Sequence, residues 1–136
     1  MYWLKLKLLQ KSNLTMTRSQ ILDYVNDQYG TLPEHLWAKY PQYEVLRHSS
    51  NKKWYGALMD IPQNKIGLSG DAIIDILVLK GNPDDIVHII EMNGFTPAYH
   101  MNKKHWFTVI LKEISNNDMI YQMIDKSYSL TKKPEK

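Results

Sequence analysis

The segment Ile73–Leu79 constrains the fold most strongly, because six of its seven residues are large and apolar. Only Asp75 interrupts the run, and β-branched residues hold most of the remaining positions. A short apolar run of this kind is typical of a strand covered on both faces, whereas a strand with one wet face alternates apolar and polar residues. The segment is therefore predicted to be a central strand of a β-sheet.

A helix is predicted over residues 18–29. Thr17 and Gln20 form a capping box, in which each side chain satisfies a backbone N–H group at the start of the helix. Apolar residues then recur at helical spacing, and Gly30 supplies the left-handed residue with which many helices end.

Two strands are predicted next, over 43–47 and 53–59, and the polar span 48–52 between them indicates a β-hairpin. Ahead of them, Pro33 is expected to open a short helical turn. The apolar residues of that turn that would face inward are Leu36 and Trp37.

The tetrapeptide Asn82–Asp85 is a strong helix start, because an Asn cap, a Pro at the first helical position and two acids near the positive end of the dipole all favour a helix. This helix is expected to end at Asn93–Gly94. Another strand is predicted over 105–111, and a last helix begins after Ser115–Asp118.

The order helix, three strands, helix, strand, helix predicts an α+β fold, in which an antiparallel sheet has its helices packed on one face. The other face, or its edge, is then free to meet a partner. The single domain is assigned to residues 17–130. It lies between an N-terminal extension, 1–16, and a basic tail, 131–136, that is expected to be disordered.

Composition excludes several classes of protein. The 136 residues include no cysteine, which excludes disulfides, thiolate metal sites and a Cys nucleophile and fits a cytoplasmic location. No segment approaches the roughly 20 apolar residues of a membrane helix, so no membrane partner is expected. Lys5 and Lys7 interrupt the apolar N-terminal run, which is interpreted as an appended tail rather than a signal peptide.

Motifs of catalysis and cofactor binding are absent as well. Gly67–Gly70 lacks the spacing and the lysine of a phosphate-binding loop, and no serine sits in a nucleophile elbow. His100 and His105 are five residues apart without the Glu of the zinc-protease pattern. No cofactor, no metal site and no enzymatic activity are therefore expected.

The formal net charge of +3 is unevenly distributed. Residues 1–16 carry +3 and residues 131–136 carry +2, whereas residues 17–130 have 11 Lys and Arg against 13 Asp and Glu and so carry −2. Because Lys and Arg contacts to phosphate dominate nucleic-acid affinity, any such binding by the domain requires a local cationic patch.

A local patch of this kind is predicted around the stretch 97–106, which concentrates His, Lys, Asn, Tyr and Trp. Its polar residues precede a strand and would meet cations of the 48–52 hairpin if the two strands are neighbours. Such a set suits phosphate contacts with base stacking, or the binding of a small anion. The candidate binding residues are Arg47, Lys53, Tyr99, His100, Asn102, Lys103, Lys104 and His105.

Structural roles are open for the same residues. His100 and Asn102 can cap and cross-link a loop, and Lys103 and Lys104 can form a solvated edge that discourages strand pairing. For each of three tryptophans, core packing is favoured over a binding role: Trp37, Trp54 and Trp106.

The string Tyr99–Lys103, followed by His105-Trp106, resembles the MmcQ/YjbR family. Further matching segments, in order, are Arg47-His48, Lys53-Trp54, Lys80–Pro83 and Ser127–Leu130. The resemblance covers roughly 17–130, and leaves out the residues before Met16 and the lysine tail. It implies a compact domain described as frataxin-like or secretion-chaperone-like. It also implies DNA binding, since the family's sheet is similar to a double-wing DNA-binding surface.

A non-enzymatic cytoplasmic binding domain is therefore predicted, with DNA or RNA as the first candidate ligand. One alternative is a protein-interaction module that uses the exposed sheet face or the last helix, which contains Met119 and Met123. The other alternative is a small-anion site built on Arg47, His100 and His105.

Overall fold

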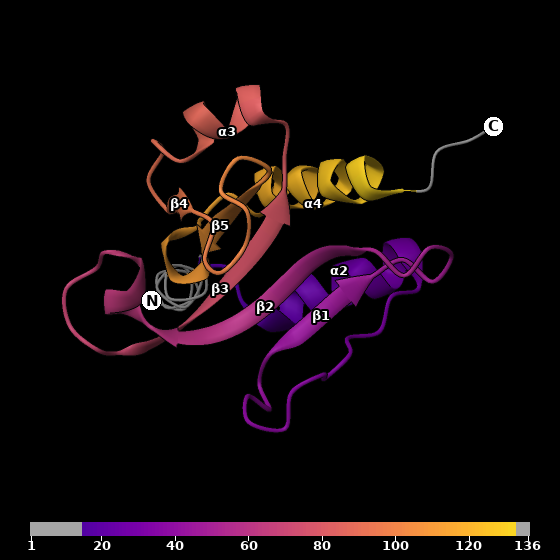
Figure 1. Ribbon diagram of the computed structural model, residues 1–136, viewed down its shortest axis with the longest axis horizontal. Coiled ribbons are helices and arrows are strands. Elements are labelled where there is room, and N and C mark those ends of the chain that lie inside the picture. Colours follow the sequence, from indigo (N-terminus) through magenta and orange to yellow (C-terminus); the bar gives the residue numbers. More distant parts are fainter. Residues whose placement is uncertain (1–14, 133–136) are drawn as a thin grey trace, which may run out of the picture.

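The computed structural model describes residues 15–132 (Figure 1). Within them lies a five-stranded antiparallel sheet of order β1-β2-β3-β5-β4. The strands are β1 (Glu44–Arg47), β2 (Trp54–Pro62), β3 (Ile73–Lys80), β4 (Phe95–Pro97) and β5 (Trp106–Ile110). The helices are α2 (Arg18–Tyr29), α3 (Pro83–Ile89) and α4 (Asn117–Thr131), with short 3₁₀ helices η1 (Gln63–Ile66) and η2 (Leu111–Glu113).

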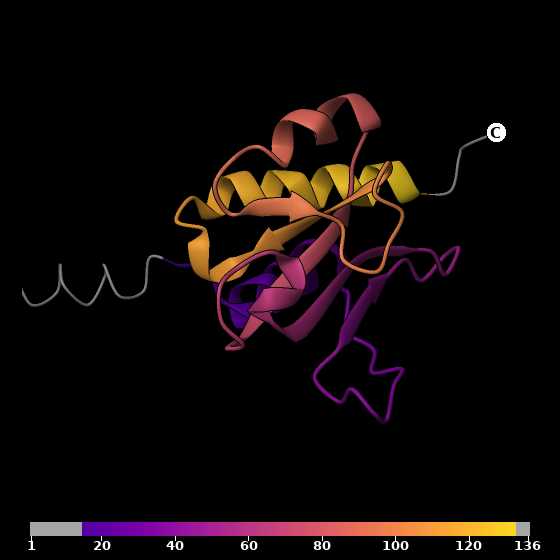
Figure 2. The ribbon, with the colours of Figure 1, turned by 60° about the vertical axis from the view of Figure 1, so that its left-hand side comes forward.

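The helices pack on one face of the sheet (Figures 1 and 2), which confirms the predicted α+β fold. Ile21 of α2, Ile86 of α3 and Ile124 of α4 join one buried cluster with Leu77 and Phe107 of the sheet. The opposite face, called the open face below, has a second apolar cluster, against which loop residues and Ile66 of η1 pack rather than the three α-helices. Its buried members are Ala57, Met59, Ile61, Ile74, Ile76, Val78, Ala98 and Ile110.

Strand β3 lies at the centre of the sheet, as the apolar run predicted. It pairs with β2 through Met59–Ile76 and with β5 through Leu79–Phe107. Alternate side chains therefore point to the two clusters, with Leu77 on the helical face and Val78 on the open face. Both are fully buried, which explains why the run lacks the alternation of a half-exposed strand.

The sheet has one strand more than the sequence predicted. Strand β4 pairs with β5 at the sheet edge, with Phe95 opposite Val109, where a simple connection was expected. Three residues are too few to show a periodic pattern, and Pro97 argues against a strand unless that strand lies at an edge. The order is therefore helix, three strands, helix, two strands, helix.

The helical turn expected at Pro33 does not form. Glu34 instead pairs its backbone with Val45 across two hydrogen bonds of 3.0 and 2.9 Å, beside the edge strand β1. Leu36 points outward, since its side chain is 44% exposed, and Trp37 is half-buried. An extended backbone at Glu34 is favoured over a helical turn because it gives β1 a second neighbour, and thereby covers part of an open sheet edge.

A β-bulge interrupts the predicted hairpin. Leu46 pairs with Gly56 and Arg47 pairs with Trp54, so Tyr55 is an extra residue in β2. Tyr55 is buried among the aromatic rings of the helical face. Trp54 consequently points to the open face, where it contacts Trp37.

The helix starts and the end of α2 follow the sequence signals, but α3 ends at Ile89 rather than at the predicted Asn93–Gly94, with turns in between. The capping box of Thr17 and Gln20 is complete, and Gly30 ends α2 with φ of 67°. At α3, Asn82 takes the cap position without a side-chain hydrogen bond to the helix, so Pro83 and the acids carry the start signal.

The domain extends slightly beyond its predicted limits. Met16 is buried and its N–H donates to the Ile114 carbonyl, whereas the sequence placed it in the extension. Helix α4 continues to Thr131, a buried residue assigned to the tail. The remaining parts of the predicted extension and tail, 1–14 and 133–136, lie outside the described residues. Within the described part, every helix is too short or too polar to cross a membrane.

Candidate functional site

The hairpin and the polar stretch before β5 lie at the same end of the sheet. Gly56 of β2 pairs with Leu79, and the next residue of β3, Lys80, pairs with Trp106 at the start of β5. Only β3 separates β2 from β5, which places the starts of the two strands about 10 Å apart, twice the usual strand spacing. Lys53, Lys80 and His105 therefore form a row along this end, called the cationic edge below.

Arg47, one of the predicted binding residues, is not part of that row. Its guanidinium forms a two-point ion pair with Glu34, through Nε to Oε2 at 2.9 Å and Nη2 to Oε1. This pairing raises the pKa of Arg47 and lowers the pKa of Glu34. The bidentate grip predicted for a ligand is thus made on a carboxylate of the same chain.

Asn102 and Lys103 have structural roles. The Asn102 Oδ1 accepts hydrogen bonds from the N–H groups of Lys104 at 2.9 Å and His105 at 3.2 Å, and so holds the turn before β5. Lys103 Nζ donates to the Ala98 carbonyl at 2.8 Å, which ties the two ends of the loop together. The loop-capping alternative is correct for Asn102.

Lys53, Lys104 and His105 are available for a ligand. Both lysines are exposed and His105 is half-exposed. Within residues 15–132, only their backbone groups take part in hydrogen bonds. Lys80 Nζ lies 5.9 Å from the centre of the Trp106 ring, so a cation and an aromatic face already meet at this edge.

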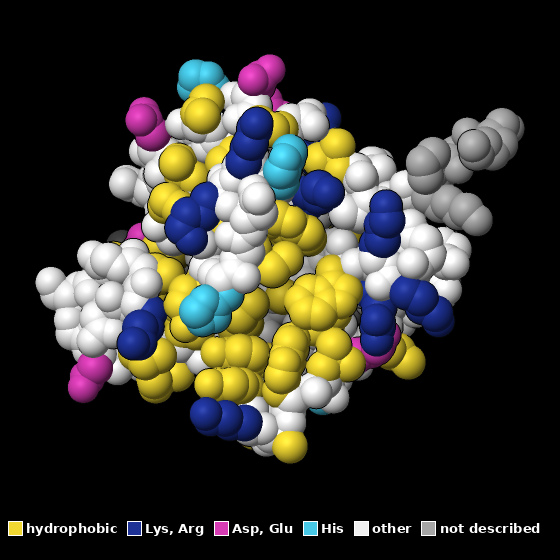
Figure 3. All heavy atoms as spheres, in the orientation of Figure 1, with side chains coloured by type: hydrophobic (Ala, Val, Ile, Leu, Met, Phe, Trp, Pro, Cys, Tyr) yellow, Lys and Arg dark blue, Asp and Glu magenta, His cyan; other side chains and the backbone are white. Residues whose placement is uncertain are grey.

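Tyr99 and His100 lie beside a hollow of about 580 Å³ on the open face, called the aromatic cleft below. One side is formed by the loop 37–43 and the other by residues 99–101, and β2 contributes Trp54 and Met59. Its aromatic residues are Trp37, Tyr40, Tyr43, Trp54 and Tyr99. Figure 3 shows this face with hydrophobic side chains gathered at its centre and Lys, Arg and His around them.

His100 adopts a left-handed backbone, with φ of 58°, and its exposed ring lies 4.0 Å from the ring of Tyr99. No hydrogen bond to its side chain occurs within the described part of the chain, so the predicted capping role does not apply to it. A non-glycine residue in this conformation is uncommon, and here it turns an imidazole outward at the rim of the cleft.

Cations outnumber acids around the cleft. Lys39, Lys65 and His100 line it with a single acid, Asp60. Burial raises the pKa of Tyr43, and electrostatic interactions with Tyr99, Tyr40 and Asp60 add to the shift. Lys65 and His100 also line a second, adjoining hollow of about 510 Å³, together with Lys103.

Sequence reasoning missed most of the cleft. The sequence favoured a core role for Trp37 and Trp54, yet each is half-exposed and lines the cleft. Tyr40 and Tyr43 were not singled out at all. The available signal was the spacing of three aromatic residues at every third position, Trp37, Tyr40 and Tyr43, in a segment that contains Pro41 and has no strand or helix pattern.

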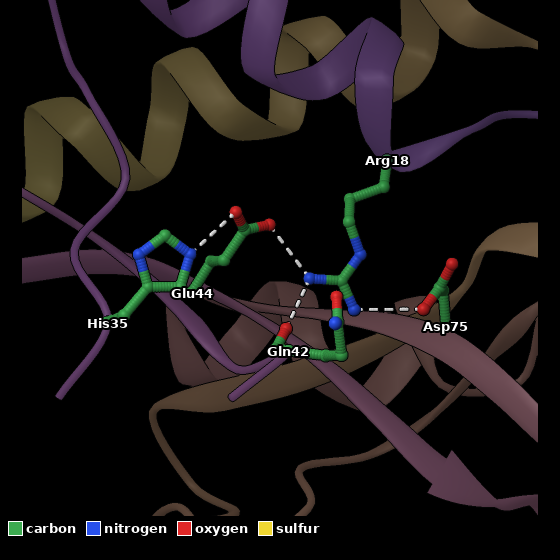
Figure 4. A network of polar contacts seen from close by, with 5 residues as sticks. All are labelled: Arg18, His35, Gln42, Glu44 and Asp75. Carbon is green, nitrogen blue, oxygen red and sulfur yellow. Dashed lines mark hydrogen bonds and ion pairs between the residues drawn. The ribbon is translucent and has the colours of Figure 1, made fainter. Parts of the chain in front are cut away.

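The loop 37–43 is anchored by a polar network on the helical side (Figure 4). Arg18 donates to the Gln42 carbonyl at 2.5 Å, to Glu44 at 2.8 Å and to Asp75 at 2.8 Å. His35 reaches the other oxygen of Glu44 at 3.1 Å. Burial opposes the positive charge, but the hydrogen bonds to Asp75 and Glu44 raise the pKa of Arg18. One guanidinium thus joins α2, β1 and β3 to the foot of the cleft loop.

Two other features of the described residues bear on function. No group of three or more His, Asp or Glu side chains is arranged to hold a metal ion within residues 15–132. A shallow hollow of about 430 Å³ lies between α3 and α4, lined by Met92, Met119 and Met123 among others. Met119 and Met123 belong to the last helix, for which the sequence left protein contacts open as an alternative role.

Comparison with known proteins identifies relatives of the whole domain. The model of the YjbR family matches residues 26–130, which confirms the resemblance seen in the sequence. The protein YyaQ of Bacillus subtilis (strain 168) is 43% identical over 117 residues, which cover 86% of this chain and 99% of YyaQ.

Solved structures match the fold as well. A Pseudomonas syringae protein is 45% identical in its crystal structure, with a TM-score of 0.84 over 86% of this chain and 100% of that one. In a solution NMR structure of a Pseudomonas syringae protein, 44% identity and a TM-score of 0.80 extend over 89% of this chain and 97% of that one. A Deinococcus radiodurans protein shares the fold at 20% identity, with a TM-score of 0.65 over 86% of this chain and 79% of that one.

Proposed function

This chain belongs to the YjbR family, and from the character of its open face we propose that it is a nucleic-acid-binding domain that prefers single strands. The proposal depends on one observation: a row of cations and a set of half-exposed aromatic rings occur together on the open face and its end. Phosphates would lie along the cationic edge, and unpaired bases would stack on the rings.

The spacing of the edge supports a single strand. Lys53 and His105 project from strand starts about 10 Å apart, with Lys80 between them on β3, so a backbone crossing the strand ends meets successive cations. Trp54 and Trp106 are half-exposed beside this row. Stacking on such rings requires an unpaired base, because the base faces of a duplex are already stacked.

The helical side offers no comparable surface. Helices α2, α3 and α4 together carry six Asp against one Arg and one Lys. Phosphate would be repelled there, whereas the segments 47–54 and 97–106 contain cations and no acid. A nucleic acid is therefore directed to the open face and its end.

The experiment is a fluorescence-anisotropy titration of labelled single-stranded DNA, single-stranded RNA and duplex DNA at 50 and 200 mM salt. Single strands are expected to bind more tightly than the duplex. Replacing Lys53 and Lys104 together by Ala should weaken binding at low salt and reduce the salt slope by roughly 1–2. Lys126→Ala, at an exposed position of α4, is the control and should leave affinity unchanged.

Absence of binding at low salt would contradict the proposal, and so would equal affinity of the double variant and the parent protein. Lys103→Ala is a less informative choice, since its amine supports the loop through the Ala98 carbonyl.

The proposal includes the absence of enzymatic activity and a cytoplasmic location. Support for the first is the make-up of the open face, where basic side chains and rings gather and, among residues 15–132, no hydrogen bond on that face joins a nucleophile to a base. Support for the second is a sequence without cysteine.

A protein-binding role is a second candidate, and the α3–α4 hollow favours it. Met92 is 40% exposed there, beside Met119 and Met123 of α4. Methionine-rich surfaces adapt well to apolar partners. Stoichiometric co-purification of a partner that is lost in Met123→Asp would support this second role.

A further inference from the structure

The aromatic cleft is built differently from the cationic edge. The Trp37 ring stands nearly perpendicular to the rings of Trp54 and Tyr43, at centroid distances of 5.8 Å and angles of 86° and 77°. Tyr40 lies stacked on Tyr43 at 4.6 Å. These edge-to-face and stacked contacts hold the rings of the cleft walls against one another, while part of each ring's surface is left to the hollow.

The fold also leaves the packing around the aromatic rings of the cleft incomplete. Trp37, Tyr43, Trp54 and Tyr99 are half-exposed, and Tyr40 is 42% exposed. On the helical face, by contrast, Tyr55 is fully buried and its hydroxyl is paired with Thr31 at 2.6 Å. Exposed aromatic surface collected in one concavity indicates that a ligand completes the packing.

Charge around the cleft selects the kind of ligand. Lys39 and Lys65 are exposed, and their amines form no hydrogen bond or ion pair within the described residues. Lys65 and His100 line both the cleft and the adjoining hollow. An anionic group attached to a ring in the cleft would therefore lie beside the Lys65 amine and the His100 imidazole, both of which can donate to it.

Size separates a small ligand from a protein partner. The cleft volume of about 580 Å³ falls within the range of roughly 300–1,000 Å³ typical of small-molecule sites. Protein interfaces are broader and flatter, and insert isolated anchor residues. A single ring with one anionic group fits the observed combination of concave aromatic walls and a cationic rim.

We propose that the aromatic cleft binds a free planar aromatic anion of about the size of a nucleoside monophosphate, with the ring among Trp37, Tyr40 and Trp54 and the anion beside Lys65 and His100. The site does not depend on nucleic-acid binding at the cationic edge, although an unpaired nucleotide of a strand would satisfy the same chemistry.

The test is a titration of intrinsic tryptophan fluorescence, since two tryptophans line the cleft. Adenosine 5′-monophosphate and indole-3-carboxylate supply a ring with a phosphate or a carboxylate. Adenosine supplies the ring alone and ribose 5-phosphate the anion alone. At least one of the two complete ligands is expected to saturate, with an affinity about tenfold or more above those of the two fragments.

Two variants locate the binding. Tyr40→Ala, at an exposed position, should weaken binding of the complete ligand by about tenfold with an unchanged circular-dichroism spectrum. Lys65→Ala should weaken binding of the complete ligand but not of adenosine. The complete ligand then loses the affinity that its anionic group contributes. The double replacement of Lys53 and Lys104 by Ala should leave this binding intact and affect only nucleic acid.

The inference is overturned if both complete ligands fail to saturate, if ribose 5-phosphate binds as tightly as they do, or if neither Tyr40→Ala nor Lys65→Ala weakens them. Failure of the nucleic-acid titration with binding of the free anion retained contradicts only the proposed function. The reverse result contradicts only the inference drawn from the cleft.

Discussion

The two faces of the sheet satisfy their polar groups to very different degrees. On the helical face, Tyr24 and Tyr29 both donate to Asp125, and Arg18 engages two carboxylates and a carbonyl. On the open face, Lys39, Lys65 and His100 have no such partners among the described residues. The helical face thus holds its polar side chains in contacts that specify the fold, whereas these three side chains of the open face make no such contact within the described residues.

The covering layers differ as well. Three helices bury the larger apolar cluster, whereas loops cover the smaller one and leave aromatic rings half-exposed. A helix fixes the positions of its side chains through its regular backbone. The loop 37–43 depends on a few contacts, such as the hydrogen bond from Arg18 to the Gln42 carbonyl. The helical face should therefore dominate stability, and the open face should tolerate substitution.

The largest effect is expected from Leu77→Ala, compared with Ile76→Ala. These neighbours on β3 are both fully buried, on the helical and open faces respectively. Leu77→Ala should lower the free energy of unfolding by about 2–5 kcal/mol. Ile76→Ala should cost less, because loops can settle into the space more readily than packed helices. Urea unfolding measures both, and an equal or larger cost for Ile76→Ala would contradict the distinction.

Asp125→Asn should have the next largest effect. Its carboxylate accepts hydrogen bonds from Tyr24 at 2.8 Å and from Tyr29, and so joins α2 to α4. Burial and then the hydrogen bond to Asp125 raise the pKa of Tyr29. Losing two charge-assisted bonds should cost about 1–3 kcal/mol of unfolding free energy. Asp23→Asn, at an exposed position of α2, is the control and should change stability far less.

A smaller effect should follow the protonation of His48. This residue is 2% exposed, and its Nε2 lies 2.8 Å from Thr131 Oγ1. Burial lowers the pKa of His48 below its ordinary value of 6.5, and Lys132 and Lys53 add to the shift. As the pH falls below that value, the unfolded chain binds the proton first, so stability decreases until the folded-state pKa is reached.

The measurement is urea unfolding at pH 7.5 and 5.5. His48→Gln should show a smaller loss of stability between these values than the parent protein, while exposed His88→Gln should keep the full loss. An unchanged pH dependence in His48→Gln would show that other groups cause it.

The smallest effect is expected on the open face. Replacing Tyr40 and Lys104 together by Ala should change the free energy of unfolding by no more than about 0.5 kcal/mol, because both are exposed and hold no side-chain hydrogen bond in the described residues. Thermal unfolding is the measurement. A loss above about 1 kcal/mol would mean that this face serves folding, and the contrast between the faces would fail.

Local signals in the sequence predicted most of the fold. The capping box at Thr17, the glycine at 30 and the apolar run of β3 act through neighbouring residues, so no knowledge of the tertiary structure was needed. Strand β4 and the extended backbone at Glu34 were missed, because each forms only against a partner that is distant in the sequence.

The candidate site divides in the same way. Lys53 and His105 could be placed at one sheet end from the hairpin and the strand that follows the motif. Arg47 could not be assigned, since its partner Glu34 lies in a segment expected to be helical. For the cleft, the aromatic spacing of the 37–43 segment was a signal for one wall only, because Trp37 and Tyr99 come together only across the finished sheet.

The bulge at Tyr55 carries one more consequence. If β2 paired regularly with β1 before Gly56, Tyr55 would point to the open face and Trp54 to the helical face. The extra residue of the bulge exchanges these two directions. Substitutions of surface residues around the cleft can therefore be tolerated. A change in the number of residues at the bulge cannot. Insertions and deletions in the first residues of β2 should be far rarer among functional variants than substitutions there.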